Sequence, residues 1–164
     1  MSTEESLRGA KEFFEKIVEP NVHEYMNTAS QFRTAINTVT ALFHMHEWLW
    51  QFKKEELEMK YEKSFAKAGA FWGHIEMLVP SSKFIRDLAN ASKHVRLTLR
   101  SSTSMTHIAN TVIQSTGYGM GSYGDGRYGG QNVMMKDNGT EVSLDGCVTD
   151  LMSFWKQLLG ELYS

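Results

Sequence analysis

The feature that most constrains the fold is a long, mainly apolar row of side chains between residues 30 and 60. Its members recur every three or four positions, as on one side of a single α-helix: Phe32, Ala35, Val39, Leu42, His46, Leu49 and Lys53. Ile36, Phe43 and Trp50 widen this row. A helix with such a stripe buries it against other elements. We therefore predict a helix over about 30–60 inside a helical bundle.

Shorter stretches repeat this spacing and predict further helices over 6–18, 64–78, about 82–95 and 145–162. Pro20 follows the first stretch and is expected to end it, because proline lacks a backbone N–H and clashes inside a helix. Pro80 is expected to separate the third helix from the fourth, with Ser81 or Ser82 as a cap. The last helix, with Trp155 in its stripe, is expected to pack on the bundle.

The region from 97 to 145 has a different character. Residues 97–116 are rich in β-branched residues and serine, which predicts a strand within 105–115. Seven of the fourteen residues in 117–130 are glycine, so this Gly/Tyr tract is predicted to be a loop. Asn138-Gly139 lies between two short β-type runs, 131–136 and 140–144, and predicts a hairpin.

Together these patterns predict an α+β fold that is mainly α. An antiparallel bundle of about four helices (1–96) precedes a small antiparallel β-sheet or hairpin with the Gly/Tyr-rich loop (97–145), and a C-terminal helix (146–164) packs on the bundle. A chain of 164 residues without a domain-scale linker is expected to form a single domain.

Composition narrows the function classes. The longest apolar runs fall far short of the roughly 20 residues that span a bilayer, and the acidic, polar N-terminus does not resemble a secretory signal. The single cysteine, Cys147, allows neither an internal disulfide nor a zinc-binding cysteine cluster. We therefore expect a cytoplasmic protein that does not enter the membrane. The net charge of −2 argues against a generic nucleic-acid coat.

The stretch from Arg86 to His94 carries the most suggestive chemistry. On a helix, Arg86, Asn90 and His94 follow one another at one-turn intervals, with Lys93 beside them. Lys83 and Asp87 are expected on the same polar side, opposite the apolar stripe. Histidine supplies a general acid or base near neutral pH, and arginine holds a phosphate and stabilises negative charge. This face could therefore form a metal-independent ribonuclease site, and it could equally be an ordinary solvated helix face.

Other residues could extend a binding surface. His46 falls on the apolar seam of the long helix, where a histidine is more often a core residue than a ligand-binding one. Tyrosines of the Gly/Tyr loop could stack on bases, or they could hold an ordered loop without any ligand. The candidate residues of this loop are Tyr118, Tyr123, Arg127 and Tyr128. The pattern requires no cofactor and no metal. Cys147 stays a remote candidate nucleophile at a helix start.

The arrangement of Arg86, Asn90 and His94 resembles that of the HEPN superfamily of small helical bundles. That resemblance implies an RNase whose Arg-x(4–6)-His motif lies on a late helix and often faces a second copy. The gap between Arg86 and His94 is seven residues, longer than this motif, and Arg100 to His107, which fits it, lies on a Ser/Thr-rich stretch.

The whole chain is similar to an uncharacterised bacterial and prophage-type family. That family combines Asn-Ala-x-Lys-His (here residues 90–94), a Gly-rich loop with Tyr-Gly repeats, a hairpin and a final Phe-Trp helix (here Phe154-Trp155). This second resemblance implies an architecture and no reaction.

Two functions therefore remain open. The first is a small interaction or nucleic-acid-binding protein, with RNA or another protein as partner, a possible homodimer, and a role related to phage or defence. The second is a HEPN-like ribonuclease in which His94 is the acid or base, Arg86 holds the phosphate and Asn90 positions the substrate.

Overall fold

The computed structural model describes residues 7–28, 31–93, 111–115 and 131–164. The helical elements are α1 (Ala10–Phe13), the π-helical segment η1 (Phe14–Val18), α2 (Glu19–Asn27), α3 (Phe32–Tyr61), α4 (Ala68–Leu78), α5 (Ser82–Lys93) and α6 (Leu144–Leu162). The strands are β1 (Thr111–Ser115), β2 (Gln131–Asp137) and β3 (Thr140–Ser143).

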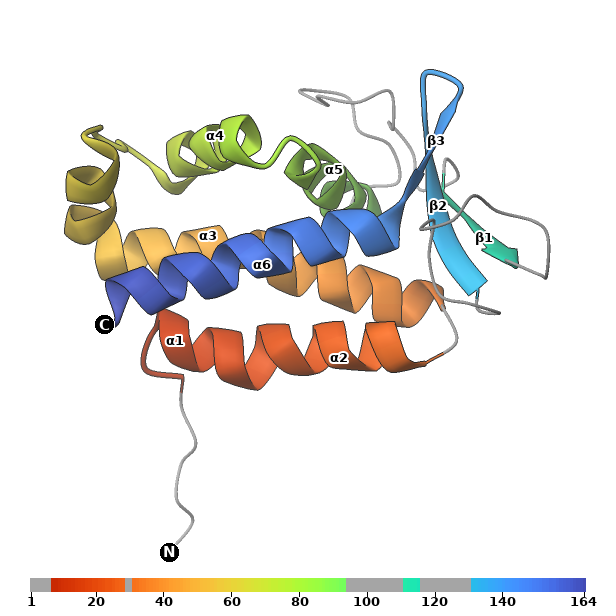
Figure 1. Ribbon diagram of the computed structural model, residues 1–164, viewed down its shortest axis with the longest axis horizontal. Helices are drawn as coiled ribbons and strands as arrows, with labels where there is room; N and C mark the ends of the chain where they lie inside the picture. Colours follow the sequence, from red (N-terminus) through yellow and green to blue (C-terminus); the bar gives the residue numbers. More distant parts are fainter. Residues whose placement is uncertain (1–6, 29–30, 94–110, 116–130) are drawn as a thin grey trace, which may run out of the picture.

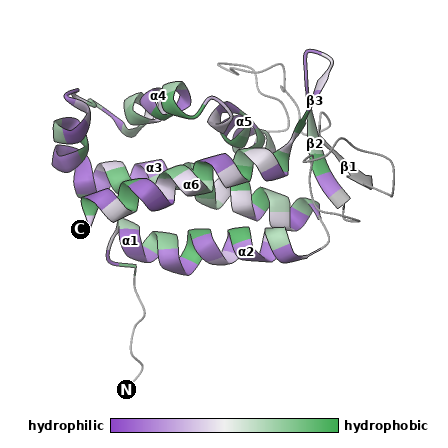
Figure 2. Cartoon of the chain, viewed as in Figure 1, coloured by the Kyte–Doolittle hydropathy of each residue, from purple (hydrophilic) through white to green (hydrophobic). Residues whose placement is uncertain are grey.

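Helix α6 lies across the middle of the molecule, with α1 and α2 on one side, α4 and α5 on the other, and the sheet at one end (Figure 1). Its apolar stripe packs against α3, α5 and β2. Trp155 is fully buried and its indole N–H donates to the Leu42 carbonyl of α3 at 3.1 Å. Hydrophobic and hydrophilic residues alternate along the ribbons of α1, α2 and α6, as expected of amphipathic helices (Figure 2). The predicted fold class, a mainly helical α+β arrangement with the last helix on the bundle, is confirmed.

Pro20 does not end the first helix, contrary to the prediction. The chain stays helical from Ala10 to Asn27, because the turn before Pro20 is π-helical. In a regular α-helix the proline ring would meet the carbonyl of residue 16. The wider π-helical turn shifts the hydrogen bonding at this point. The Asn21 side chain then donates to the Ile17 carbonyl at 2.8 Å.

The long helix α3 has the predicted extent, with a kink at Lys53, whose φ and ψ of −137° and 27° are not helical. The Lys53 ammonium bonds to Glu56 at 2.7 Å and lies 4.7 Å above the Tyr163 ring. Helix α4 begins four residues later than predicted. The Glu58 carboxylate holds the connecting segment instead, accepting from the Phe65 backbone N–H at 2.6 Å.

Three strands form an antiparallel sheet in the order β1-β2-β3. The predicted hairpin is confirmed, since Asp137 pairs with Thr140 and both turn residues, Asn138 and Gly139, have positive φ. That conformation is typical of a tight two-residue turn. The fully buried Val133 and Met135 place β2 against the helical core. No described helix is both long and apolar enough to cross a membrane.

Candidate functional site

The predicted active face lies on α5, and the structure describes three of its members. The Arg86 side chain is 17% exposed, Asn90 is partly exposed and Lys93 is exposed. His94 lies outside the described residues, as do Tyr118, Tyr123, Arg127 and Tyr128 of the Gly/Tyr loop. The described part of the face therefore consists of Arg86 and Asn90, one helical turn apart, with Lys93 at the end of the helix.

Arg86 takes part in a network of ion pairs. Its guanidinium contacts Glu76 Oε1 of α4 at 2.7 Å, and its Nε and Nη2 donate to Asp87 Oδ1 at 3.0 and 2.9 Å. The Trp72 indole N–H donates to the same Glu76 oxygen at 2.8 Å. The single positive charge of Arg86 is therefore paired with two carboxylates.

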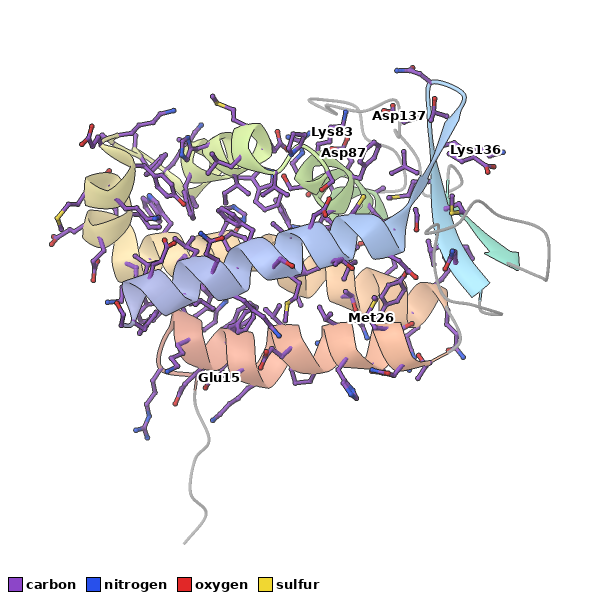
Figure 3. The ribbon with its side chains drawn as sticks, viewed as in Figure 1. Glu15, Met26, Lys83, Asp87, Lys136 and Asp137 are labelled. Carbon is purple, nitrogen blue, oxygen red and sulfur yellow. The ribbon has the colours of Figure 1, made fainter. Side chains whose placement is uncertain are left out.

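The burial of Asp87 differs from the prediction for this helix. Its position in the sequence placed it on the outward, polar side together with Arg86. The side chain projects from α5, as does Lys83 one turn earlier (Figure 3), yet only 1% of it is exposed. Arg86 makes this burial possible, because a buried carboxylate needs a paired cation and hydrogen-bond donors.

His46 lies in the core. It is 3% exposed, and its Nδ1–H donates to the Phe43 carbonyl one turn earlier. Its ring lies 4.8 Å from that of Phe43 and 5.1 Å from that of Trp72. Burial lowers the pKa of His46 below its ordinary value of 6.5, which favours the neutral ring at neutral pH.

Trp72 thus lies between two predicted site residues. One side of its ring system meets His46, and its indole N–H reaches Glu76, which contacts Arg86. His46 and Arg86 belong to one connected cluster, with His46 at its inner end and Arg86 at its outer end. Such a cluster holds α3, α4 and α5 together.

Neither Cys147 nor a histidine pair provides a second reactive centre among the described residues. Cys147 is 3% exposed, and burial raises the pKa of its thiol to about 12, so the nucleophilic thiolate is not populated at neutral pH. His44 points away from His46 and is hydrogen-bonded to Glu47 at 3.1 Å. Over the described ranges, no three His, Cys, Asp or Glu side chains converge as metal ligands would.

A groove that the sequence analysis missed runs between the α1–η1–α2 segment and α3. Its volume is about 440 Å³, and its lining residues are Phe13, Ile17, Asn21, Asn37, Thr40, Ala41, His44 and Trp48. The four polar or aromatic members from α3 share a spacing of three or four residues: Asn37, Thr40, His44 and Trp48. This second row on α3 is visible in the sequence and could have indicated a binding surface. The groove itself forms only because the first helix packs beside the row.

Comparison of the chain with protein-family models, with curated proteins and with solved structures gives no significant match.

Proposed function

We propose that this protein works by binding a partner protein in the cytoplasm, and that it does not catalyse a reaction. The observation that carries the proposal is the state of Arg86. Its guanidinium contacts Glu76 and the buried Asp87, so a phosphate would have to displace carboxylates that hold α4 to α5. A phosphate clamp needs an arginine whose donors point to the substrate.

His46, the one predicted site histidine that the structure describes, supports the same proposal. An RNase needs an acid or base that reaches the substrate with a pKa near neutrality. His46 is buried against Phe43 and Trp72, with a lowered pKa. In this proposal the Arg86–Asn90–His94 face is structural, with Lys93 as a solvated neighbour.

A protein partner is favoured over RNA by charge. Affinity for RNA depends on lysine and arginine side chains that neutralise phosphates. The chain has a net charge of −2, and among the described residues no lysine or arginine lines the groove between the first helix and α3. Neutral amide and aromatic side chains fit a polypeptide better than a phosphate backbone.

The test is an incubation of the purified protein with mixed RNA in chelator, beside His94→Ala and Asn90→Ala. We expect the RNA to remain intact with all three proteins, and a labelled RNA 12-mer to show no salt-sensitive binding in fluorescence polarisation. Cleavage by the unmodified protein that His94→Ala abolishes would overturn the proposal and establish the HEPN-like ribonuclease. Equal cleavage by all three would identify a contaminating nuclease, and repurification would then decide the result.

A further inference from the structure

The solvent-facing side of α4 is apolar. The exposed residues of this helix and of the turn that follows it are Gly69, Gly73, Met77, Leu78 and Pro80. Met77 is 73% exposed and Leu78 is 49% exposed. Glu76, the one charged residue of α4, pairs with Arg86 instead of facing water. A surface helix normally exposes charged side chains, so this face has the composition of a contact surface.

This face is not needed for the packing of α4 within the chain. The helix lies at the outer edge of the molecule (Figure 1), and its other side packs against α3 and α5. The residues buried there are Phe71, Trp72 and Ile75. The apolar residues on the outer side are therefore available to a partner.

The exposed residues are arranged symmetrically about Gly73. Helix α4 runs from Ala68 to Leu78, so Gly73 is its central residue. Gly69 and Met77 lie four residues before and after it, on the same side of the helix. A Cβ atom at Gly69 or Gly73 would meet no other atom within 4 Å, so the helix is open to close approach there. The face thus carries an open position and a protruding side chain at equal distances from its centre.

The charges at the ends of α4 are the reverse of the usual pattern. Carboxylates near the N-terminus of a helix and cations near its C-terminus interact favourably with the helix dipole. The N-cap of α4 is instead the exposed Lys67, and its first turn has no acidic residue and its last turn no basic residue. A second α4 in the opposite direction would bring Lys67 to the carbonyl end that lacks a cation.

We propose that two copies of this chain associate through α4, with the two helices antiparallel and a two-fold axis at Gly73. Residues equally distant from position 73 then face each other, so Met77 packs against the partner subunit's Gly69. Lys67 faces the carbonyl end at the partner subunit's Val79, the C-cap residue. A two-fold interface requires a patch that is complementary to itself, which this face provides. A parallel pair would place like charges and like side chains together.

The size of the face sets the expected affinity. Standard interfaces bury about 1,600 Å² in total, and a helix of eleven residues offers less, so we expect a dissociation constant of about 10–100 μM. The contact uses α4, and not the α5 face for which the HEPN resemblance implied a second copy. It does not depend on the proposed function, because it joins two copies of the same chain.

The experiment is sedimentation velocity of the unmodified protein, Gly73→Glu and Gly160→Glu, from about 1 μM to about 1 mM. A residue on a two-fold axis faces its own copy, so Gly73→Glu brings two carboxylates together. Gly160 of α6 is the matched control, because it is also an exposed helical glycine with no atom within 4 Å of a Cβ. Circular dichroism checks that both variants keep the fold.

A second measurement tests the position of the axis. Gly73→Cys places two thiols opposite each other, at a separation that a disulfide can bridge. Gly160→Cys is again the control, and the native Cys147 is buried in both variants. After incubation with oxidised glutathione, non-reducing electrophoresis measures the fraction of covalent dimer.

We expect a monomer–dimer equilibrium in the unmodified protein and in Gly160→Glu, and a dissociation constant raised about ten-fold or more in Gly73→Glu. Gly73→Cys should form the covalent dimer, and Gly160→Cys should remain monomeric. The inference is overturned if the unmodified protein stays monomeric throughout, or if Gly73→Glu dimerises as tightly as the unmodified protein. Cross-linking of Gly160→Cys as fast as Gly73→Cys would overturn it as well.

Discussion

The Tyr25 hydroxyl donates a hydrogen bond to Asp145 Oδ1 over 2.5 Å and thereby ties the end of α2 to the first turn of α6. Tyr25 is fully buried and Asp145 is 6% exposed. A hydrogen bond to an ionised group is stronger than a neutral one, and a buried carboxylate that loses a donor is costly. This contact joins two elements that lie far apart in the sequence.

Tyr25→Phe should therefore lower the free energy of unfolding by about 1–3 kcal/mol. The substitution keeps the ring and removes only the hydroxyl that Asp145 accepts from. Urea denaturation measures the effect as a lower midpoint with an unchanged slope. Tyr163→Phe is the matched control, since Tyr163 is 38% exposed and its loss of a hydroxyl should leave the midpoint in place. Equal midpoints for the two variants would show that the Tyr25–Asp145 bond contributes nothing.

Arg86→Ala is predicted to destabilise the protein by about 3 kcal/mol, because it removes the guanidinium that contacts both Glu76 and the buried Asp87. Thermal or urea unfolding measures this loss. Arg33→Ala is the control, because Arg33 pairs with Glu24 at the surface and such pairs contribute less than about 1 kcal/mol. An unfolding midpoint of Arg86→Ala equal to that of the unmodified protein would show that these ion pairs do not stabilise the fold. Arg86 would then again be a candidate ligand-binding residue.

The sequence was sufficient to predict the helices and the hairpin because burial and turn geometry decide them locally. The spacing of three and four residues in α3 and α6 predicts which faces of these helices are buried. The dipeptide Asn138-Gly139 predicts a turn in which both residues have positive φ. The continuation of the first helix through Pro20 was not predictable in this way. It depends on a π-helical turn, and no rule of side-chain spacing indicates one.

The candidate site was less predictable because it depends on packing between elements. Spacing placed Asp87 on the polar side of α5, whereas the pairing with Arg86 allows it to be buried. The row of Asn37, Thr40, His44 and Trp48 is visible in the sequence, but a second helix must lie beside it to form a groove. Ion pairs and grooves that form between helices can be identified only when the packing of those helices is known.

His74→Phe is predicted to stabilise the protein by about 1 kcal/mol. Both ring nitrogens of His74 are inaccessible to solvent and neither has a hydrogen-bond partner within the described structure. The ring lies 4.6 Å from Tyr61 and 5.6 Å from Phe65, in surroundings that suit phenylalanine. Removing unpartnered buried polar atoms recovers their desolvation cost. The comparison is with His74→Gln, which keeps a polar group there and should bring no gain in the unfolding midpoint; a gain in both variants would refute this explanation.

Acid should destabilise the protein well before its carboxylates titrate. Burial lowers the pKa of both His46 and His74 below 6.5. At a pH below 6.5 the unfolded chain therefore binds protons at these sites that the folded protein does not bind. The stability that the two neutral rings confer is fully present above pH 6.5. It is lost progressively as the pH falls from 6.5 towards their folded pKa values, by up to about 1.4 kcal/mol per pH unit for each ring.

Urea midpoints measured between pH 7.5 and 5 would reveal this loss, because the lowered pKa values of Glu56, Glu58 and Glu161 act only below their ordinary value of 4.5. His74→Phe should make the decline shallower, because the contribution of His74 is then removed. His23→Gln, which removes an exposed histidine, is the control variant. A midpoint that stays constant from pH 7.5 to 5 would show that protonation of these two rings does not destabilise the folded protein. His46 would then have to be accessible to solvent and to ligands.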